Sequence, residues 1–161
     1  MHSTSQYEST EMLLRGHNEV DLAFKENLDM AEGVTHIITS TTAPILPDGV
    51  IATETLKAEG DAPGTAAYVH YNGPTHQLAT MCTGMAVLDP GASPHPPHQH
   101  PEEEFMIVAS GTGVIEVDGK PTEVGPGAIM YCGANVFHGI TNTGDTPMTF
   151  YWSKWIAKGF E

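Results

Sequence analysis

One short segment of the sequence gathers residue types that bind metal ions. His98, His100 and Glu104 are separated by even numbers of residues. Alternate side chains of an extended strand point to the same face. An unbroken strand here would therefore direct two imidazoles and one carboxylate the same way, and in a small β-barrel that direction can be the interior. This donor set suits a first-row divalent metal with positions left open for substrate or oxygen.

A second interpretation stays open for this segment taken alone. A stretch rich in histidine and proline can also be a solvated loop or a weak surface metal binder. Glu103 is the register alternative to Glu104, but it has the opposite parity. His95, three residues before His98, is a candidate acid–base group at the barrel mouth, and an ordinary surface histidine is its alternative.

A later stretch places one more histidine, His138, on another predicted strand. With both stretches in order, the chain resembles the cupin superfamily. The first cupin motif reads Gly, five residues, His-x-His, three or four residues, Glu, six residues, Gly. The second reads Gly, five residues, Pro-x-Gly, two residues, His, three residues, Asn. The positions that keep this spacing are His98, His100, Glu104 and Gly111 in the first motif, and Gly127, His138 and Asn142 in the second.

The chain departs from the two motifs at three positions. Gly91 lies one residue further upstream than the first motif asks. Gly133 stands where the family usually has proline, and Asn135 where it usually has glycine. Asparagine tolerates a positive φ better than most residues, so Asn135 can still form the turn. These departures concern the shape of loops more than metal binding.

The resemblance implies a metal site and its ligands. It implies one divalent transition metal ion, and cupins hold iron, manganese, nickel, zinc, copper or cobalt in such sites; the choice among them stays open. Glu104 could remain a ligand throughout or act as a general base, and His95 is the second candidate catalytic residue. The implied ligands are His98, His100, Glu104 and His138.

The elements that must position these residues are mostly short strands. The 161 residues include 17 glycines and 12 prolines, which leave few stretches long enough for helices. Asp118 and Gly119 predict a hairpin turn. Many short strands with turns every 8–12 residues or so predict a sandwich or barrel. We therefore expect an all-β chain with a single cupin jelly-roll barrel over residues 36–161, built from strands at 36–39, 50–55, 65–71, 76–88, 104–109, 114–117, 128–132, 136–141 and 148–156.

The first part of the chain follows a different pattern. Apolar residues recur at helical spacing between Asn18 and Gly33, which can cap the two ends of a helix. We expect residues 1–35 to form a short N-terminal helical arm that packs on the barrel or on a second subunit. A homodimer is the expected assembly, because the resemblance implies pairing through sheets or N-terminal arms.

The amino-acid composition indicates which binding partners and which cellular location to expect. The formal charge of −14 disfavours nucleic acid and anionic membranes as partners. Cys82 and Cys132 form no disulfide framework and are expected to be reduced. The N-terminus shows no signal-peptide pattern, and no apolar run is long enough to span a bilayer. The expected location is the cytoplasm.

The expected function is that of a metal-dependent enzyme on a small organic substrate. Dioxygenase-type and isomerase- or lyase-type reactions both remain open, and a non-catalytic metal- or small-molecule-binding module or sensor is the alternative. The sole arginine is Arg15, and Lys154 lies near the C-terminus, so a neutral or metal-chelating substrate is expected rather than a phosphate or carboxylate. The aromatic residues that the pattern leaves unassigned are Tyr131, Tyr151 and Trp152.

Overall fold

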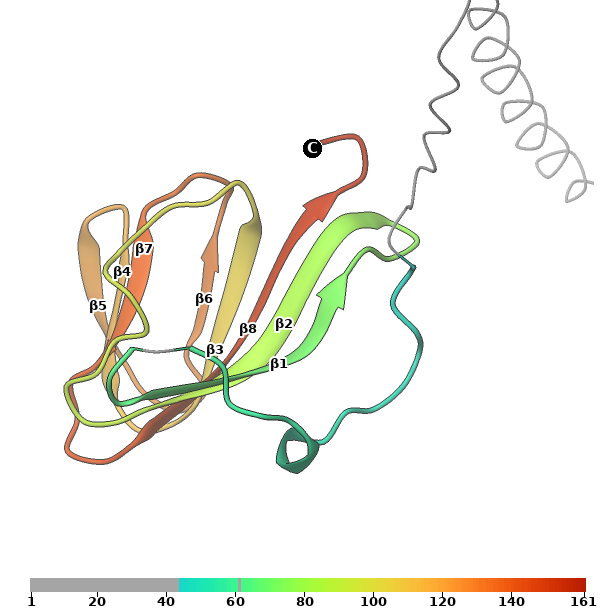
Figure 1. The fold of residues 1–161 in the computed structure, drawn as a ribbon. Coiled ribbons are helices and arrows are strands. Elements are labelled where there is room, and N and C mark those ends of the chain that lie inside the picture. The colour runs from blue at the N-terminus through green and yellow to red at the C-terminus, as the bar shows by residue number, and fades with distance from the viewer. Residues whose placement is uncertain (1–43, 61) are drawn as a thin grey trace, which may run out of the picture. The chain divides into compact units, whose positions relative to one another are not determined.

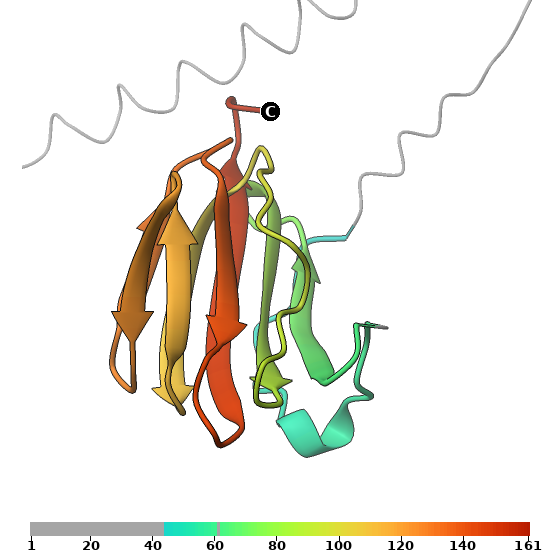
Figure 2. The ribbon, with the colours of Figure 1, turned by 90° about the vertical axis from the view of Figure 1, so that its left-hand side faces the viewer.

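The computed structural model describes residues 44–60 and 62–161, which form a two-sheet β-barrel. The predicted helix at 18–33 and strand at 36–39 lie outside these residues. A five-stranded sheet has the order β1-β2-β8-β3-β6, and a three-stranded sheet has the order β5-β4-β7. The two sheets face each other (Figure 1), and the turned view looks onto the smaller one (Figure 2). The prediction of an all-β jelly roll is confirmed. The strands are β1 (Thr65–Gly73), β2 (Leu78–Leu88), β3 (Glu103–Ser110), β4 (Gly113–Val117), β5 (Lys120–Val124), β6 (Ile129–Cys132), β7 (His138–Asn142) and β8 (Met148–Ala157).

Strand β3 shows how the sequence pattern forms the barrel. Glu104, Met106 and Val108 are buried, whereas Phe105 and Ile107 between them are exposed. Period-two burial of this kind sets the register, because a shift by one residue would exchange the two faces. The core between the sheets is wholly apolar in its main cluster: Ala86, Leu88, Met106, Val108, Ile115, Met130, Cys132, Ile140, Met148 and Phe150.

Two turns contain residue types that tolerate the positive φ angles these turns require. Asp118 and Gly119 have φ of 51° and 71°, as a two-residue hairpin loop with two positive φ values requires, and they join β4 to β5. Asn135 has φ of 59°, which confirms that this asparagine occupies the left-handed position where the family motif has glycine. The chain can therefore depart from the motif there without losing the turn.

Two predictions about local structure are wrong. The expected strand at 50–55 contains a 3₁₀ turn, η1 (Thr53–Thr55), and Val50 is 97% exposed. No described strand pairs with this stretch, and Thr55 Oγ1 donates instead to the Ala52 carbonyl at 2.7 Å. The unbroken strand through His98 and His100 is also wrong, since β3 begins only at Glu103. Prolines in this stretch have no N–H to donate to a neighbouring strand, so it runs as a loop.

No helix in the described part of the chain has the length and apolar character needed to cross a bilayer.

Candidate metal centre

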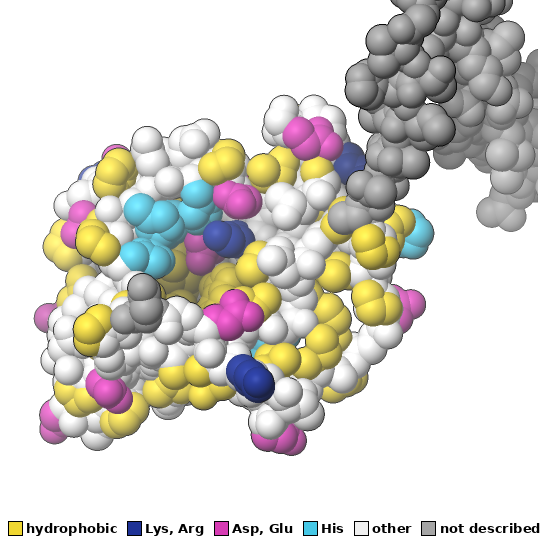
Figure 3. Space-filling view, in the orientation of Figure 1, with side chains coloured by type: hydrophobic (Ala, Val, Ile, Leu, Met, Phe, Trp, Pro, Cys, Tyr) yellow, Lys and Arg dark blue, Asp and Glu magenta, His cyan; other side chains and the backbone are white. Residues whose placement is uncertain are grey.

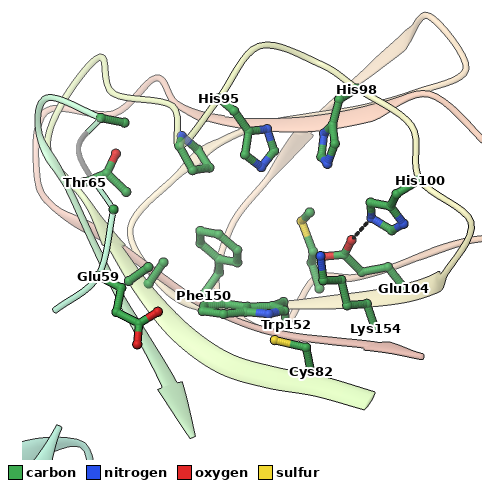
Figure 4. Close-up of a pocket in the computed structure, with 16 residues that line it drawn as sticks. Glu59, Thr65, Cys82, His95, His98, His100, Glu104, Phe150, Trp152 and Lys154 are labelled. Carbon is green, nitrogen blue, oxygen red and sulfur yellow. Dashed lines mark hydrogen bonds and ion pairs between the residues drawn. The ribbon is translucent and has the colours of Figure 1, made fainter. Parts of the chain in front are cut away.

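Three histidine side chains, those of His98, His100 and His138, lie close together in the barrel, and Figure 4 shows two of them, His98 and His100, beside Glu104. His98 lies in the loop before β3, but its backbone pairs with that of His138 at the start of β7, through N–H···O bonds of 2.9 and 2.8 Å. His100 follows two residues later. One nitrogen from each of the three rings lies within 4.8 Å of the other two. The loop therefore reaches the position that we expected from a strand, and an isolated β-bridge fixes it there.

Glu104 completes the cluster from the inner face of β3. Its side chain is 5% exposed, and its Oε2 lies 2.8 Å from His100 Nε2 and 3.1 Å from His138 Nε2. The structure thus brings together the four residues that the family resemblance implies as ligands, although they come from three separate segments. His138 is almost completely buried, and His98 and His100 are half-buried.

The hydrogen bonds of two imidazoles decide which nitrogen is free. His100 Nδ1 donates to the Glu102 carbonyl at 3.1 Å, and His138 Nδ1 donates to the Val136 carbonyl at 2.8 Å. A carbonyl oxygen can only accept, so both Nδ1 atoms carry the hydrogen, and a neutral ring then has its lone pair on Nε2. Both Nε2 atoms face the carboxylate of Glu104, which is itself an acceptor. An arrangement of acceptors facing one another requires protons or a cation between them.

His98 supplies a third nitrogen without a partner. Its Nδ1 is buried and has no hydrogen-bond partner in the described part of the chain. Burial, followed by the positive charges of His95, His138, His100 and Lys154, lowers the pKa of His98 from 6.5 to about 4. The ring is therefore neutral at neutral pH and can offer a lone pair. Three imidazole nitrogens and one carboxylate oxygen fit a first-row divalent metal.

His95 lies beside the cluster at the rim of the pocket. Its ring centroid is 4.0 Å from that of His98, and its side chain is exposed. His95 Nδ1 donates to the Pro96 carbonyl at 3.2 Å, so the neutral ring keeps its Nε2 lone pair free. A group of this kind can accept a proton from a molecule in the pocket.

Three members of the cluster, His98, His100 and Glu104, form one wall of a cavity of about 300 Å³. Figure 3 shows histidines gathered at the edge of a hollow with an apolar floor. Phe150 and Trp152 on β8 and Met106 on β3 form part of that floor. Gly84 makes room for Trp152, because a Cβ on Gly84 would lie 2.5 Å from the indole Cη2. The cavity is large enough for a small organic molecule next to the histidines.

Sequence reasoning missed one residue that lines the pocket and left another unassigned. Lys154 lines the cavity from β8, although its place near the C-terminus suggested otherwise. Its parity with Phe150 and Trp152 could have revealed it, since these residues share the inner face of one strand. Trp152 also lines the cavity, whereas Tyr131 and Tyr151 are exposed on the outer face of the sheet.

Comparisons with known proteins agree with this architecture. Residues 84–154 match the family model described as Cupin domain. The dimethylsulfoniopropionate lyase DddW of Ruegeria pomeroyi is 29% identical over 97 residues, which are 58% of this chain. The chain spans 63% of the length of that lyase.

Solved structures resemble the same part of the chain. KdgF of Halomonas sp. superposes with a TM-score of 0.57 and 16% identity, over 67% of this chain and 94% of KdgF. The polyketide cyclase RemF of Streptomyces resistomycificus superposes with a TM-score of 0.56 and 20% identity, over 68% of this chain and 80% of RemF. At such identities these two structures show the fold alone.

Proposed function

Because the chain belongs to the cupin superfamily, we propose that it is a metal-dependent enzyme with lyase- or isomerase-type activity on a small, metal-chelating organic molecule. The observation that carries this proposal is the convergence of three imidazoles and the Glu104 carboxylate at the wall of a cavity of about 300 Å³. The residues that would hold the metal are His98, His100, Glu104 and His138. A divalent metal at this position supplies Lewis acidity that polarises an oxygen of the bound molecule.

The other side chains around the cavity have separate roles in the proposed reaction. His95 Nε2 takes a proton from a carbon or hydroxyl of the substrate, because its lone pair is free and its ring lies at the rim. Glu104 would stay in place as a ligand, since it is buried and its Oε2 already lies beside the Nε2 atoms of His100 and His138. Phe150 and Trp152 pack on the apolar part of the substrate and exclude water.

A reaction that consumes no oxygen is supported by the sequence relative. The protein that is 29% identical over 97 residues is named as a lyase. In an elimination, His95 takes the proton, the electron pair of the broken C–H bond forms a double bond, and the leaving group departs with its own electron pair. The atoms and electrons balance without an oxidant. Dioxygenase chemistry at the same site would instead consume oxygen, and the test below separates the two.

Elemental analysis of protein purified without chelator tests the metal. We expect about one transition-metal ion per chain, and much less in His100→Ala, which lacks one nitrogen donor. His76→Ala is the matched control, because His76 is exposed and far from the cavity lining. Equal metal content in wild type and His100→Ala would contradict the proposal.

Activity is then measured on the metal-loaded protein with a panel that includes dimethylsulfoniopropionate and enolisable ketones and acids. Product formation without oxygen uptake supports a lyase or isomerase. Product formation with stoichiometric oxygen uptake would replace it with a dioxygenase. Metal and ligand binding without turnover of any compound would favour a non-catalytic binding module.

The partners and location follow as part of the same proposal. The charge of −14 supports a protein that binds neither nucleic acid nor membranes. Cys82 and Cys132 are both free, which supports the reducing cytoplasm. The outer face of the larger sheet exposes Phe105, Ile107 and Ile129, which supports a homodimer formed through this face. Analytical ultracentrifugation tests it, and a monomeric mass would refute it.

A further inference from the structure

A positively charged side chain, that of Lys154, lines the cavity and has no part in the proposed metal chemistry. Among the described residues that line the cavity, Lys154 is the only lysine or arginine. The backbone of Lys154 is paired with Glu104 of β3 on one side and with Cys82 of β2 on the other. Figure 4 shows its side chain rising from the floor of the pocket toward Glu104. The regular ladder on both sides fixes this side chain on the inner face of the sheet.

The ammonium group has no charged partner in the described part of the chain. The recorded ion pairs there join histidines to Glu102 and Glu104, and none reaches Lys154. No side-chain hydrogen bond of Lys154 is recorded among the described residues either. The neighbours on the floor, Phe150, Trp152 and Met106, offer no acceptor oxygen. The carboxylates among the described lining residues are Glu59 and Glu104, and neither forms an ion pair with Lys154. A charge beside an apolar floor gains more from an opposite charge than the same pair would gain in water.

A bound divalent cation would add to this positive field. The Glu104 carboxylate then faces the metal, which leaves the lysine charge directed at the cavity. A molecule that binds the metal through one oxygen and packs an apolar body on Trp152 would extend toward Lys154, because both residues line the same cavity. An anionic oxygen at that position would form a charge-assisted hydrogen bond.

We propose that Lys154 is a specificity-determining residue that binds a carboxylate or enolate oxygen of the substrate, so that the site selects small organic anions over neutral molecules of the same shape. This inference rests on the proposed function and narrows its substrate class. It proposes an anionic substrate in place of the neutral one expected from the sequence, an expectation that rested on the lack of arginine after Arg15 and on the place of Lys154 near the C-terminus.

The probe pair for the test is benzoate and benzamide, which share a ring and differ in charge. Calorimetric titrations are made with wild type, Lys154→Met, Lys154→Arg and Lys158→Met, each in chelator-treated and zinc-loaded form. Lys158 is the matched control, because it is exposed and lies outside the cavity lining. Lys154→Met keeps an unbranched side chain that is one heavy atom shorter, and it removes the charge.

We expect wild type to prefer benzoate, and Lys154→Met to lose this preference by about tenfold, the effect of one charge-assisted hydrogen bond. Lys154→Arg and Lys158→Met should keep it. The same ratio of the two affinities in wild type and Lys154→Met, or no preference in wild type, would overturn the assignment. Failure of zinc to bind would instead refute the metal centre, while the chelator-treated series would still decide the role of Lys154.

Discussion

Asn142 joins the two segments that carry the histidines, and its replacement by alanine gives a sharp test of the structure. Its backbone accepts from Gly91 N at 2.9 Å and donates to the Ala92 carbonyl at 3.0 Å, at the start of the loop that leads to His98. Its completely buried side chain donates to the carbonyls of Leu88 and Thr146, at 2.9 Å each, and accepts from Gly144 N at 2.9 Å. Asn142→Ala removes the three side-chain bonds and leaves the backbone bonds possible.

The expected loss follows from these three bonds. A hydrogen bond in a folded protein contributes about 1 kcal/mol net, and a buried group left without a partner costs about 1–3 kcal/mol. Thr146 is exposed, so water can replace the lost donor there, whereas Leu88 is completely buried. We therefore expect the free energy of unfolding to fall by about 3 kcal/mol.

Urea unfolding of the chelator-treated protein, followed by circular dichroism, measures this loss. Asn72→Ala is the control, because Asn72 is exposed and its side chain forms no hydrogen bond with any described residue; its effect should stay within about 0.5 kcal/mol. A loss below about 1 kcal/mol in Asn142→Ala would refute the reasoning, since the three bonds would then contribute nothing net.

Three further predictions concern the site. The pKa of His98 is lowered from its ordinary 6.5 to about 4 in the folded chain, so the unfolded chain binds the proton first as the pH falls, and the free energy of unfolding of the metal-free protein should decrease between pH 6.5 and pH 4. Urea titrations should show a weaker pH dependence for His98→Gln. The same pH dependence in wild type and His98→Gln would contradict this prediction. A Cβ on Gly139 would lie 3.1 Å from Pro97 Cα, so Gly139→Ala should displace the loop before His98 and weaken zinc binding by about tenfold in a competition assay; unchanged affinity would refute this. Burial, followed by the charge of Glu104, raises the pKa of Cys132 to about 11, so a thiol reagent should label the half-buried Cys82 in the folded protein and Cys132 only after unfolding; rapid labelling of both would show that Cys132 is accessible.

The sequence predicts the fold well because period-two burial and turn residues are local signals. Glu104 and Met106 are buried as their parity requires, and Asn135 adopts the positive φ that its place in the turn demands. The stretch at 50–55 shows the limit of this reasoning. Its β-branched residues favour a strand, but a strand also needs a partner, and partners are decided by contacts distant in the sequence.

The candidate site was predictable only in part, for the same reason. Parity was the wrong argument for His98 and His100, because proline interrupts the strand and a β-bridge to His138 places the loop instead. The spacing shared with a known family implied four residues that the structure does bring together, since such spacing reflects three-dimensional proximity. Lys154 belongs to no motif, and its role became visible only when β8 was paired between β2 and β3.

The alternation of buried and exposed residues in β3 limits the insertions and deletions that this strand tolerates. Deleting a single residue near the start of β3 would put Phe105 in the place of Glu104 at the centre of the cluster and expose the carboxylate on the far side. Changes in chain length are therefore tolerable in the turns between strands but not within this one. A surface variant at Phe105 or Ile107 that shifts the strand along its neighbours would abolish metal binding without touching any ligand.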